Sequence, residues 1–305
     1  TDFKRGDSDL SIALHPRILL RLPILSSPMD TVTETAMATA LAQVGGLGVI
    51  HRNLTVQVQA GMVRSVKKAK VSDRAAAAVD SEGRLLVGAA VGAGSDIDER
   101  LKALSEEEVD LVVIDSGHGH SRFILEAVTF AKRTYGTRIV VMGGNVATGD
   151  GAKALVKAGA DIIRVGVGPG SICTTRIVTG MGVPQITAFL AVAAALRGSS
   201  VTFVADGGIR QMGDMAKSLA AGASAVMLGS MLSGHDESPG ERTEVDGKSF
   251  KRYRGMGSIG AMQKGGAERY GQSVKTAAKK LVAEGVEGLV PYRGAVGDFL
   301  YQAKG

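Results

Sequence analysis

The sequence predicts an α/β fold, a closed (β/α)8 TIM barrel with a mobile active-site flap after its eighth strand. Short, nearly continuous aliphatic runs recur eight times along the chain, and stretches with apolar residues three and four positions apart separate them. Unbroken apolar runs are typical of parallel strands that are buried on both faces. Eight repeats favour closure into a barrel, and an open doubly wound sheet is the alternative.

Glycine, aspartate or asparagine residues bound most of these apolar runs, as expected for strands that end in turns. The expected strands cover residues 23–30, 46–51, 85–92, 111–117, 138–145, 162–168, 201–208 and 225–230. The expected helices cover residues 33–44, 96–108, 121–135, 150–158, 185–197 and 210–221. The Ala-Gly-Ala triplets at 158–160 and 221–223 are typical helix stops. We therefore expect residues 1–305 to form a single catalytic barrel.

Three stretches do not fit the repeat and are interpreted as loops. Residues 71–84 form a short polar, alanine-rich connector, and residues 166–184 follow the sixth strand, on the face where barrel enzymes place their chemistry. Residues 234–266 are rich in Gly, Ser, Glu and Arg and are interpreted as irregular. A disordered linker is one reading of this stretch, but its place on the catalytic face favours a cover of the active site, so residues 234–283 are predicted to form a flap.

Composition excludes several classes of protein. Hydrophobic residues make up 45% of the chain and charged residues 22%, as in ordinary globular proteins. Aromatic residues make up only 4%, without any Trp, which argues against a nucleic-acid stacking surface. The formal net charge is +6, but the basic residues are scattered and the densest clusters, at 67–70 and 279–280, are typical of solvated helix faces. A positive balance suits small anionic ligands.

The chain also lacks the signals of export and of membrane insertion. Its single cysteine cannot form an internal disulfide, and the apolar runs fall short of the roughly 18 residues that span a bilayer. The first residues carry no signal-peptide pattern. We expect a cytoplasmic protein with no membrane partner.

Cys173 is the most informative single residue. A lone cysteine most often packs in a core as a small hydrophobe. Here it lies in the glycine-rich loop 166–176, between Ser171 and two threonines, where core packing would waste backbone entropy. This setting favours a reactive thiol, which needs help from a helix dipole or a bound cation to ionise.

Two glycine-containing turns predict a phosphate site. Asp206-Gly207-Gly208 closes the seventh strand and Gly229-Ser230 closes the eighth, the two positions where barrels most often bind phosphate through backbone N–H groups. Ser171 could add a hydroxyl donor. Asp206 either caps the following helix or accepts hydrogen bonds from a ribose diol.

Asp115, at the end of the fourth strand, could likewise cap a helix or bind a ligand hydroxyl. It is followed by His118 and His120. Two histidines at this spacing invite a zinc interpretation, which is disfavoured because no third ligand lies nearby. No histidine lies near Cys173 in the sequence, which argues against a cysteine protease.

With these residues assembled, the chain resembles the inosine 5'-monophosphate (IMP) dehydrogenase family. The resemblance spans essentially the whole chain and is carried by residues 26–34, 143–148, 166–188, 205–210 and 253–261. Guanosine monophosphate reductase, the nearest relative, shares the barrel, the cysteine loop and the phosphate site. The pair Arg269-Tyr270 distinguishes the two activities, because the resemblance implies that it serves a hydrolytic half-reaction that the reductase lacks.

The resemblance implies NAD-dependent oxidation of IMP to XMP. The Cys173 thiolate would add to C2 of the hypoxanthine ring, and hydride transfer to NAD would leave a covalent thioimidate. The flap would then enter the vacated dinucleotide pocket. There Arg269 would act as the general base for water, with Thr175 and Tyr270 in the proton network. An arginine base is unusual, since guanidinium is almost always protonated.

The resemblance also implies specific binding residues and partners. The nucleotide would be held by Ser171, Asp206, Gly207, Gly208, Gly229, Ser230, Tyr253, Arg254, Gly255, Met256, Gly257 and Glu284. The nicotinamide half of NAD would contact Asp115, Gly166, Val167 and Gly168. Met29 and Asn145 would be lesser contacts in the site. Carbonyls of Gly168, Gly170 and Cys173 would coordinate potassium. Family members are usually homotetramers.

Two departures from the family pattern are visible. Residues 71–84 stand where the family commonly inserts a pair of regulatory CBS modules, so allostery through those modules is expected to be absent. The N-terminal segment lacks the usual sequence of the family's first hairpin, which leaves closure of the barrel bottom without an expected element.

Two other functions remain open from the sequence. One is a GMP reductase, which would convert GMP to IMP with NADPH. The other is a catalytically silent nucleotide-binding or nucleic-acid-binding barrel, which draws on the basic isoelectric point of about 9.4. Nucleic acid is the weaker partner, because the basic residues are scattered and every catalytic position of the family is filled.

Overall fold

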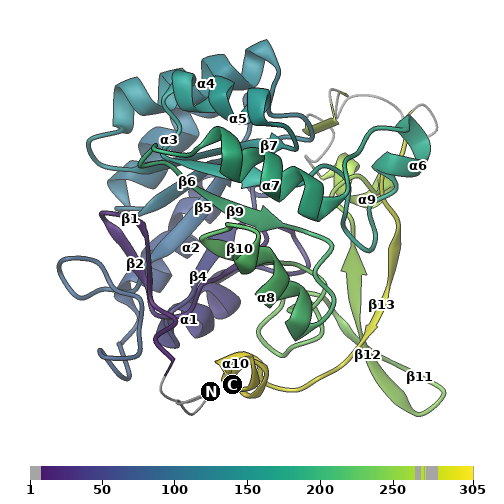
Figure 1. Cartoon of the computed structure of the whole chain (residues 1–305). Helices are drawn as coiled ribbons and strands as arrows, with labels where there is room; N and C mark the ends of the chain where they lie inside the picture. Colours follow the sequence, from purple (N-terminus) through teal and green to yellow (C-terminus); the bar gives the residue numbers. More distant parts are fainter. Residues whose placement is uncertain (1–7, 265–268, 271, 273–280, 305) are drawn as a thin grey trace.

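The computed structural model describes residues 8–264, 269–270, 272 and 281–304. Its centre is a closed barrel of eight parallel strands, which confirms the predicted fold class (Figure 1). In barrel order these are β3 (Ile24–Ser26), β4 (Leu47–Ile50), β5 (Val87–Val91), β6 (Leu111–Ile114), β7 (Val140–Val146), β8 (Ile162–Val165), β9 (Thr202–Asp206) and β10 (Ala225–Leu228). β10 pairs with both β9 and β3 and so closes the ring.

Both faces of these strands are buried, which explains why their sequences do not alternate with polar residues. In β6, Leu111 and Val113 belong to the core inside the barrel, whereas Val112 and Ile114 pack outward against the helices. All four are completely buried. Alternate residues thus fill two separate cores, one within the barrel and one between barrel and helices.

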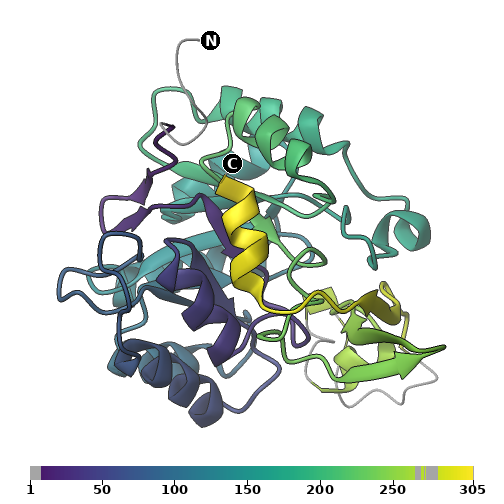
Figure 2. The ribbon, with the colours of Figure 1, turned by 90° about the horizontal axis from the view of Figure 1, so that it is seen from below.

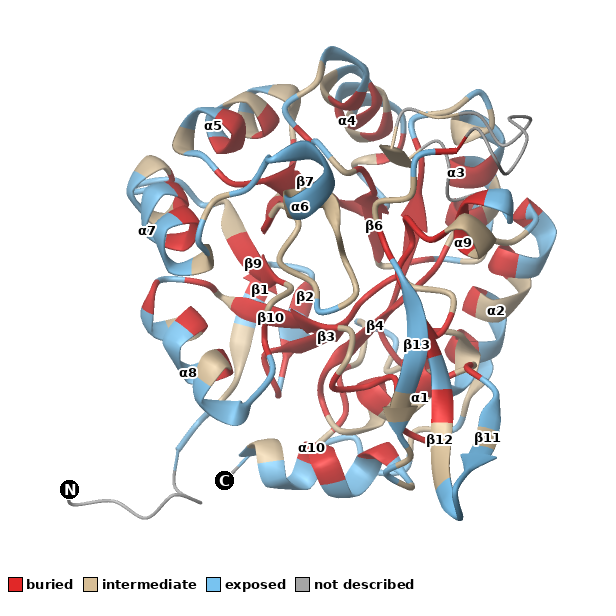
Figure 3. Cartoon of the chain, turned by 90° about the vertical axis from the view of Figure 1, so that its right-hand side faces the viewer, coloured by how far each residue is buried: buried red, intermediate tan, exposed pale blue. Residues whose placement is uncertain are grey.

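Helices surround the barrel with their apolar faces inward (Figure 3). They are α1 (Thr35–Gln43), α2 (Val56–Lys68), α3 (Ile97–Glu106), α4 (Arg122–Tyr135), α5 (Gly149–Ala158), α7 (Gln185–Ala195), α8 (Met212–Ala220) and α10 (Val296–Lys304). Gly159, with φ +100°, ends α5, and Gly222, with φ +103°, follows α8, as the two Ala-Gly-Ala triplets predicted. Only glycine adopts this left-handed backbone without strain.

Two of these helices were not among the sequence-based expectations. In α2, Val56, Ala60 and Val63 face the core at helical spacing, and the Thr55 hydroxyl caps the helix by accepting from the Val58 N–H at 3.3 Å. The C-terminal α10 packs against α1 and completes the ring of helices (Figure 2). Both carry the signals of an amphipathic helix.

The barrel bottom is closed by an N-terminal hairpin, an element that the sequence analysis did not expect. Strand β1 (Ile12–His15) pairs antiparallel with β2 (Ile18–Leu20). Leu14, Ile18 and Leu20 are almost completely buried and join the core inside the barrel. The hairpin is therefore a plug, built from apolar residues that do not depend on a particular family sequence.

The interpretation of residues 234–266 as irregular is wrong for about half of that stretch. β11 (Arg242–Val245), β12 (Lys248–Arg254) and β13 (Glu287–Pro291) form an antiparallel sheet beside the barrel mouth, and α9 (Ile259–Gln263) follows β12 (Figure 1). Of the predicted flap, residues 265–268, 271 and 273–280 lie outside the described residues.

The connector 71–84 is held to the barrel by charges. Asp80 accepts hydrogen bonds from Lys67 Nζ at 3.0 Å and from Arg84 Nε at 2.9 Å. Lys67 also pairs with Asp110 at 2.6 Å, and Val79 forms a β-bridge with Leu85. The short connector thus has its own anchor on α2 and on the start of β6.

Among the described residues, the helices are all too short or too polar to cross a lipid bilayer.

Candidate active site

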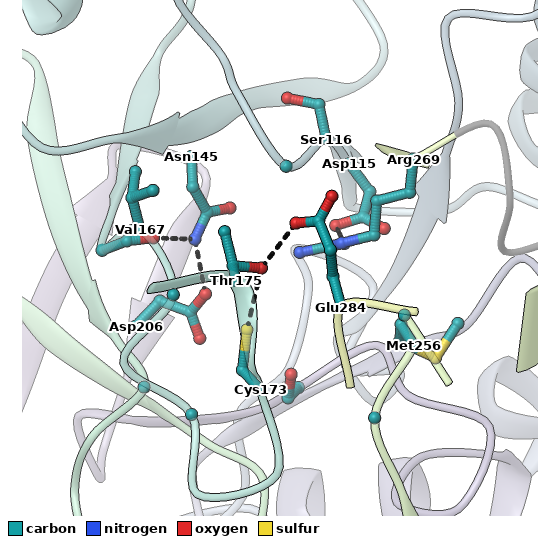
Figure 4. Close-up of a pocket in the computed structure, with 18 of the residues that line it drawn as sticks. Asp115, Ser116, Asn145, Val167, Cys173, Thr175, Asp206, Met256, Arg269 and Glu284 are labelled. Carbon is teal, nitrogen blue, oxygen red and sulfur yellow. Dashed lines mark hydrogen bonds and ion pairs between the residues drawn. The ribbon is translucent and has the colours of Figure 1, made fainter. Parts of the chain in front are cut away.

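A cavity of about 710 Å³ opens where the barrel strands end, on the face that the sequence predicted (Figure 4). This volume lies within the roughly 300–1,000 Å³ of typical small-molecule sites. Its lining includes nearly all the residues predicted for catalysis and binding: Asp115, Gly166, Val167, Gly168, Gly170, Ser171, Cys173, Thr175, Asp206, Gly207, Gly208, Gly229, Ser230, Tyr253, Gly255, Met256, Gly257, Arg269, Tyr270 and Glu284. Met29 and Asn145 line it too.

Arg254 is the exception. It does not line the cavity, and its guanidinium forms an ion pair with Asp30 beside it. The structure therefore separates Arg254 from the other residues that were expected to touch the nucleotide.

Cys173 is partly buried, and its side chain begins a short chain of hydrogen bonds. Its Sγ donates to Thr175 Oγ1 at 3.2 Å, and Thr175 Oγ1 donates to Glu284 Oε2 at 2.8 Å (Figure 4). Cys173 also forms a β-bridge with Gly285, which brings the cysteine loop next to Glu284. The sequence analysis assigned Glu284 to nucleotide binding. In the structure, a single hydroxyl group, that of Thr175, connects the Glu284 carboxylate to the thiol.

Glycines allow the cysteine loop to pack against the end of β9. Gly207 and Gly208 have φ +81° and +76°, and both lie against Pro169. Gln185 Nε2 donates to the carbonyls of Asp206 and Gly207, at 3.0 and 3.1 Å, and so holds the turn at 206–208 in place. A side chain at either glycine would strain the backbone and crowd the proline.

The predicted phosphate end of the cavity combines these glycines with Gly229, Ser230 and Tyr253. Burial raises the pKa of Tyr253, and a hydrogen bond with Ser171 opposes this only partly. The phenol therefore stays protonated at neutral pH and can donate to an anionic ligand. Backbone N–H groups and neutral hydroxyls suit a phosphate, since they bind it without requiring a counter-ion.

A cluster of buried charges, which includes Asp206 at the start of the glycine turn, also lines the cavity. Arg164 Nη1 lies 2.6 Å from Asp115 Oδ1, and Arg164 Nε lies 2.9 Å from Asp206 Oδ2. Asp115 is also paired with Arg269, and Arg52 Nε lies 3.9 Å from its other oxygen. Three guanidinium groups thus share one carboxylate, which leaves an excess of positive charge around Asp115.

This environment changes the acidity of the predicted base. Burial lowers the pKa of Arg269; Tyr270 opposes the shift and the positive charge of Arg52 adds to it. Burial also raises the pKa of Tyr270, while Arg269 lowers it. Burial and the like charge of Arg52 disfavour the charged form of this guanidinium, whereas its pairing with Asp115 favours that form.

Asn145 also lines the cavity. Its Nδ2 donates to Asp206 Oδ2 at 2.6 Å and to the Gly166 carbonyl at 2.8 Å. Its Oδ1 is buried and has no hydrogen-bond partner among the described residues. Since buried polar atoms are almost always paired, this oxygen is suited to accept a hydrogen bond from a ligand.

Sequence reasoning missed Arg52, Arg164 and Gln185. Arg164 carried a signal, because it is a charged residue within the otherwise aliphatic β8 and is only 2% exposed. A charge buried inside a strand must be paired, and its partners are functional candidates. Arg52 and Gln185 lie just after β4 and at the start of α7, where the sequence alone marks nothing unusual.

Among the described residues, no group of three His, Cys, Asp or Glu side chains could hold a metal ion. The potassium prediction concerns backbone carbonyls instead. Gly170 and Cys173 are the ends of one tight turn, closed by a hydrogen bond from Cys173 N to the Gly170 carbonyl at 3.1 Å, and Gly168 lies two residues before it. Neutral carbonyl oxygens on such a turn fit the chemistry of a monovalent cation.

Comparison with known proteins agrees with this geometry. The family described as "IMP dehydrogenase / GMP reductase domain" matches residues 1–305. The inosine-5'-monophosphate dehydrogenase of Escherichia coli (strain K12) is 39% identical over 411 aligned positions, which cover 98% of this chain and 84% of that protein. The enzyme of the same name from Mycobacterium tuberculosis (strain ATCC 25618 / H37Rv) is 38% identical over 423 positions, covering 100% of this chain and 80% of that protein.

The enzyme of the same name from Haemophilus influenzae is 38% identical over 411 positions, covering 98% of this chain and 84% of that protein. These alignments are longer than the chain itself, so the relatives contain residues without a counterpart here. On the full-length family match and on these identities, the chain belongs to the IMP dehydrogenase / GMP reductase family.

Proposed function

We propose that this protein is an NAD-dependent IMP dehydrogenase that oxidises IMP to XMP through a covalent intermediate on Cys173. One observation carries the proposal: the single cysteine of the chain lies in the cavity that also contains the glycine turns at the ends of β9 and β10. A purine nucleotide whose phosphate binds those turns extends its base along the cavity toward the thiol. Membership of the family and the names of the relatives support this substrate.

The first half-reaction needs a thiolate. The chain from Cys173 through Thr175 to Glu284 offers a route by which the thiol proton leaves toward a carboxylate. The thiolate then forms a bond to C2 of the purine, and the hydrogen on C2 leaves as hydride. Bound NAD supplies the hydride acceptor. Asp115, Asn145 and the turn 166–168 would hold and orient the nicotinamide half.

The second half-reaction needs a base for water, and Arg269 is placed for that role. Its pairing with Asp115 and the hydrogen bond from Gly117 N to its carbonyl, 3.1 Å, put it at the end of β6. This is the place proposed for the nicotinamide half, so the Arg269-Tyr270 segment and the dinucleotide would occupy it in turn. Water, deprotonated by Arg269, attacks C2 of the adduct, and the released sulfur is protonated again through Thr175.

GMP reduction is the second candidate, because the family includes both activities. The presence of Arg269 and Tyr270 in the cavity favours the dehydrogenase, since release of ammonia needs no activated water. The three relatives described above are also named as dehydrogenases. A silent nucleotide-binding or nucleic-acid-binding barrel is disfavoured, since the catalytic positions are filled and lie together.

Several finer statements belong to the same proposal. Potassium held by the carbonyls of Gly168, Gly170 and Cys173 would fix the shape of the cysteine loop. The 71–84 connector is proposed to stand in place of the regulatory modules, which the length of the alignments supports. A homotetramer and a cytoplasmic location are proposed from the family resemblance and from the sequence.

One assay tests the proposal. Purified protein is mixed with IMP, NAD and potassium chloride, and formation of NADH is followed by its absorbance. We expect turnover in the wild type and none in Cys173→Ala. Oxidation of NADPH with GMP, without any reaction of IMP and NAD, would establish the reductase instead. Turnover that survives in Cys173→Ala would disprove the covalent mechanism, and tight RNA binding without turnover would favour the silent barrel.

A further inference from the structure

Asp30 and Arg254 form a partly buried ion pair, and neither residue lines the cavity. Arg254 Nε lies 3.0 Å from Asp30 Oδ1, and Arg254 Nη2 lies 2.6 Å from Asp30 Oδ2. The Asp30 side chain is 5% exposed and the Arg254 side chain 18%. Two parallel hydrogen bonds of this kind fix orientation as well as distance, because the planar guanidinium matches both oxygens of the carboxylate.

A third side chain extends this contact to α9. Asn53 Nδ2 donates to Asp30 Oδ2 at 3.0 Å and to the Ala261 carbonyl at 3.3 Å. The backbone N–H of Arg254 donates to Thr31 Oγ1 at 3.2 Å. The segment Gly255–Ser258 is therefore tied to the barrel at both ends, through Arg254 before it and through α9 after it.

This tied segment reaches the cysteine through two rows of backbone hydrogen bonds. Gly255 N donates to the Val286 carbonyl at 3.0 Å, and Glu284 N donates to the Gly257 carbonyl at 2.9 Å. On the other side of residues 284–286, Val286 N donates to the Ile172 carbonyl at 2.9 Å, and Thr174 N donates to the Glu284 carbonyl at 3.0 Å. Residues 284–286 thus lie between the anchored segment and the cysteine loop.

From this arrangement we infer that Asp30, Asn53 and Arg254 are positioning residues that hold the Cys173–Thr175–Glu284 chain in its reactive geometry. None of these three residues lines the cavity, so we assign them a positioning role and no direct contact with ligand or reacting atoms. They join two loops of the barrel rim, after β3 and β4, to the sheet that carries Gly255–Gly257 and Glu284. Without this anchor, the sheet and the cysteine loop would keep their mutual hydrogen bonds but lose their fixed place on the barrel.

The inference rests on the proposed function for its kinetic consequences only. Because Cys173 is the single cysteine of the chain, its rate of alkylation by iodoacetamide reports directly on the surroundings of the thiol. That measurement needs no substrate and no turnover. If the wild type turned over neither IMP nor GMP, the proposed function would be wrong. The positioning role could still be tested by alkylation of Cys173.

The experiment compares Asp30→Asn, Arg254→Gln, their double variant and Arg254→Lys with the wild type. We expect kcat to fall about 10-fold or more in both single variants, with a smaller change in KM for IMP, because misplacement acts mainly on the reacting groups. Cys173 alkylation at neutral pH should slow in parallel. The double variant should be little worse than the worse single variant, since both lose the same contact. Arg254→Lys, which keeps the charge, should recover part of the activity.

A second arginine–carboxylate pair supplies the matched control. Arg64 binds Glu107 with both its Nε and its Nη2, between α2 and α3 and away from the cavity. Arg64→Gln should leave kcat, KM and the alkylation rate unchanged.

Folding is checked by circular dichroism at the assay temperature. If Asp30→Asn or Arg254→Gln does not fold, Arg254→Lys decides the question alone, because it retains the charge but cannot form the two-pronged contact. Folded variants with wild-type kcat and a wild-type alkylation rate would overturn the inference. An effect of Arg64→Gln equal to that of Arg254→Gln would overturn it as well, since it would reveal a general loss of stability.

Discussion

The hydroxyl of Thr175 donates a hydrogen bond of 2.8 Å to Glu284 while it accepts one of 3.2 Å from the Cys173 thiol. A hydroxyl in this position can pass a proton in either direction without moving. No histidine lies near Cys173 in the sequence, and the structure instead brings to Thr175 a carboxylate from a segment more than a hundred residues later in the chain. The proposed route for the thiol proton therefore rests on a contact that only the tertiary structure reveals.

Glu284→Gln is expected to slow catalysis at the first chemical step. The amide keeps the size of the side chain and can still accept the Thr175 hydrogen bond, but it cannot take up the proton. General acid–base groups typically contribute about 10²–10⁴-fold to the rate, and we expect kcat to fall by about 10²-fold. The burst of NADH under single-turnover conditions should slow by the same factor. An unchanged burst rate would exclude Glu284 as the acceptor of the thiol proton.

Arg269→Gln is expected to block the second half-reaction and spare the first. The variant loses the proposed base but keeps Cys173, Thr175 and Glu284. It should form about one NADH per active site quickly and then stop, with the purine still attached to Cys173. Mass spectrometry of the intact protein would detect the adduct.

The matched variant for this experiment is Tyr270→Phe, which keeps the ring and removes the hydroxyl. Burial raises the Tyr270 pKa, so this phenol is protonated at neutral pH, and its loss should cost less than the loss of Arg269. If Arg269→Gln turned over as fast as the wild type without an accumulated adduct, another group would have to activate the water.

The sequence predicted the barrel well because strands buried on both faces need unbroken aliphatic runs, and such runs are rare elsewhere. It failed where strands are exposed. β11 and β12 carry charged residues such as Arg242, Glu244 and Lys248. Because of these charges, the sequence analysis interpreted the segment as irregular. A local signal was present, since Asp246-Gly247 has φ +49° and +70° and forms the turn of this hairpin.

The candidate site also contains some residues that the sequence could predict and others that it could not. Motifs identified the cysteine loop and the glycine turns, because their chemistry requires particular residues at fixed spacing. The sharing of Asp115 by Arg52, Arg164 and Arg269, and the pairing of Arg254 with Asp30, depend on how distant loops meet above the barrel. No sequence spacing encodes these distances. Arg254 was expected in the cavity because its neighbours in the chain, Tyr253 and Gly255, belong to the same motif. Those neighbours do line the cavity, whereas Arg254 does not.

His235 is expected to make folding stability depend on pH near neutrality. It is 2% exposed and stacks beside Phe299 with ring centroids 5.5 Å apart. Burial lowers its pKa below the usual 6.5; the Gly294 carbonyl opposes the shift. As the pH falls, His235 therefore takes up a proton more readily in the unfolded chain than in the folded protein. This contribution to stability is fully present above pH 6.5 and is lost as the pH falls below that value.

Urea unfolding of the wild type and of His235→Gln at several pH values would measure this dependence. The wild type should lose up to about 1.4 kcal/mol per pH unit more than the variant below its unfolded-state pKa, the slope for one proton. Parallel curves for the two proteins would mean that His235 is charged equally in the folded and unfolded states.

Gly48 and Gly61 are expected to respond oppositely to replacement by alanine. A Cβ at Gly48 in β4 would collide with Ala38, so α1 lies directly on the strand at this point. Overpacking of this kind typically costs about 1–3 kcal/mol. Gly61 lies within α2, and a Cβ there would meet nothing within 4 Å. Gly61→Ala should stabilise the fold by roughly 0.5–1 kcal/mol, because alanine favours the helix and restricts the unfolded chain. Thermal unfolding followed by circular dichroism would measure both, and a Gly48→Ala protein as stable as the wild type would contradict such close packing between α1 and β4.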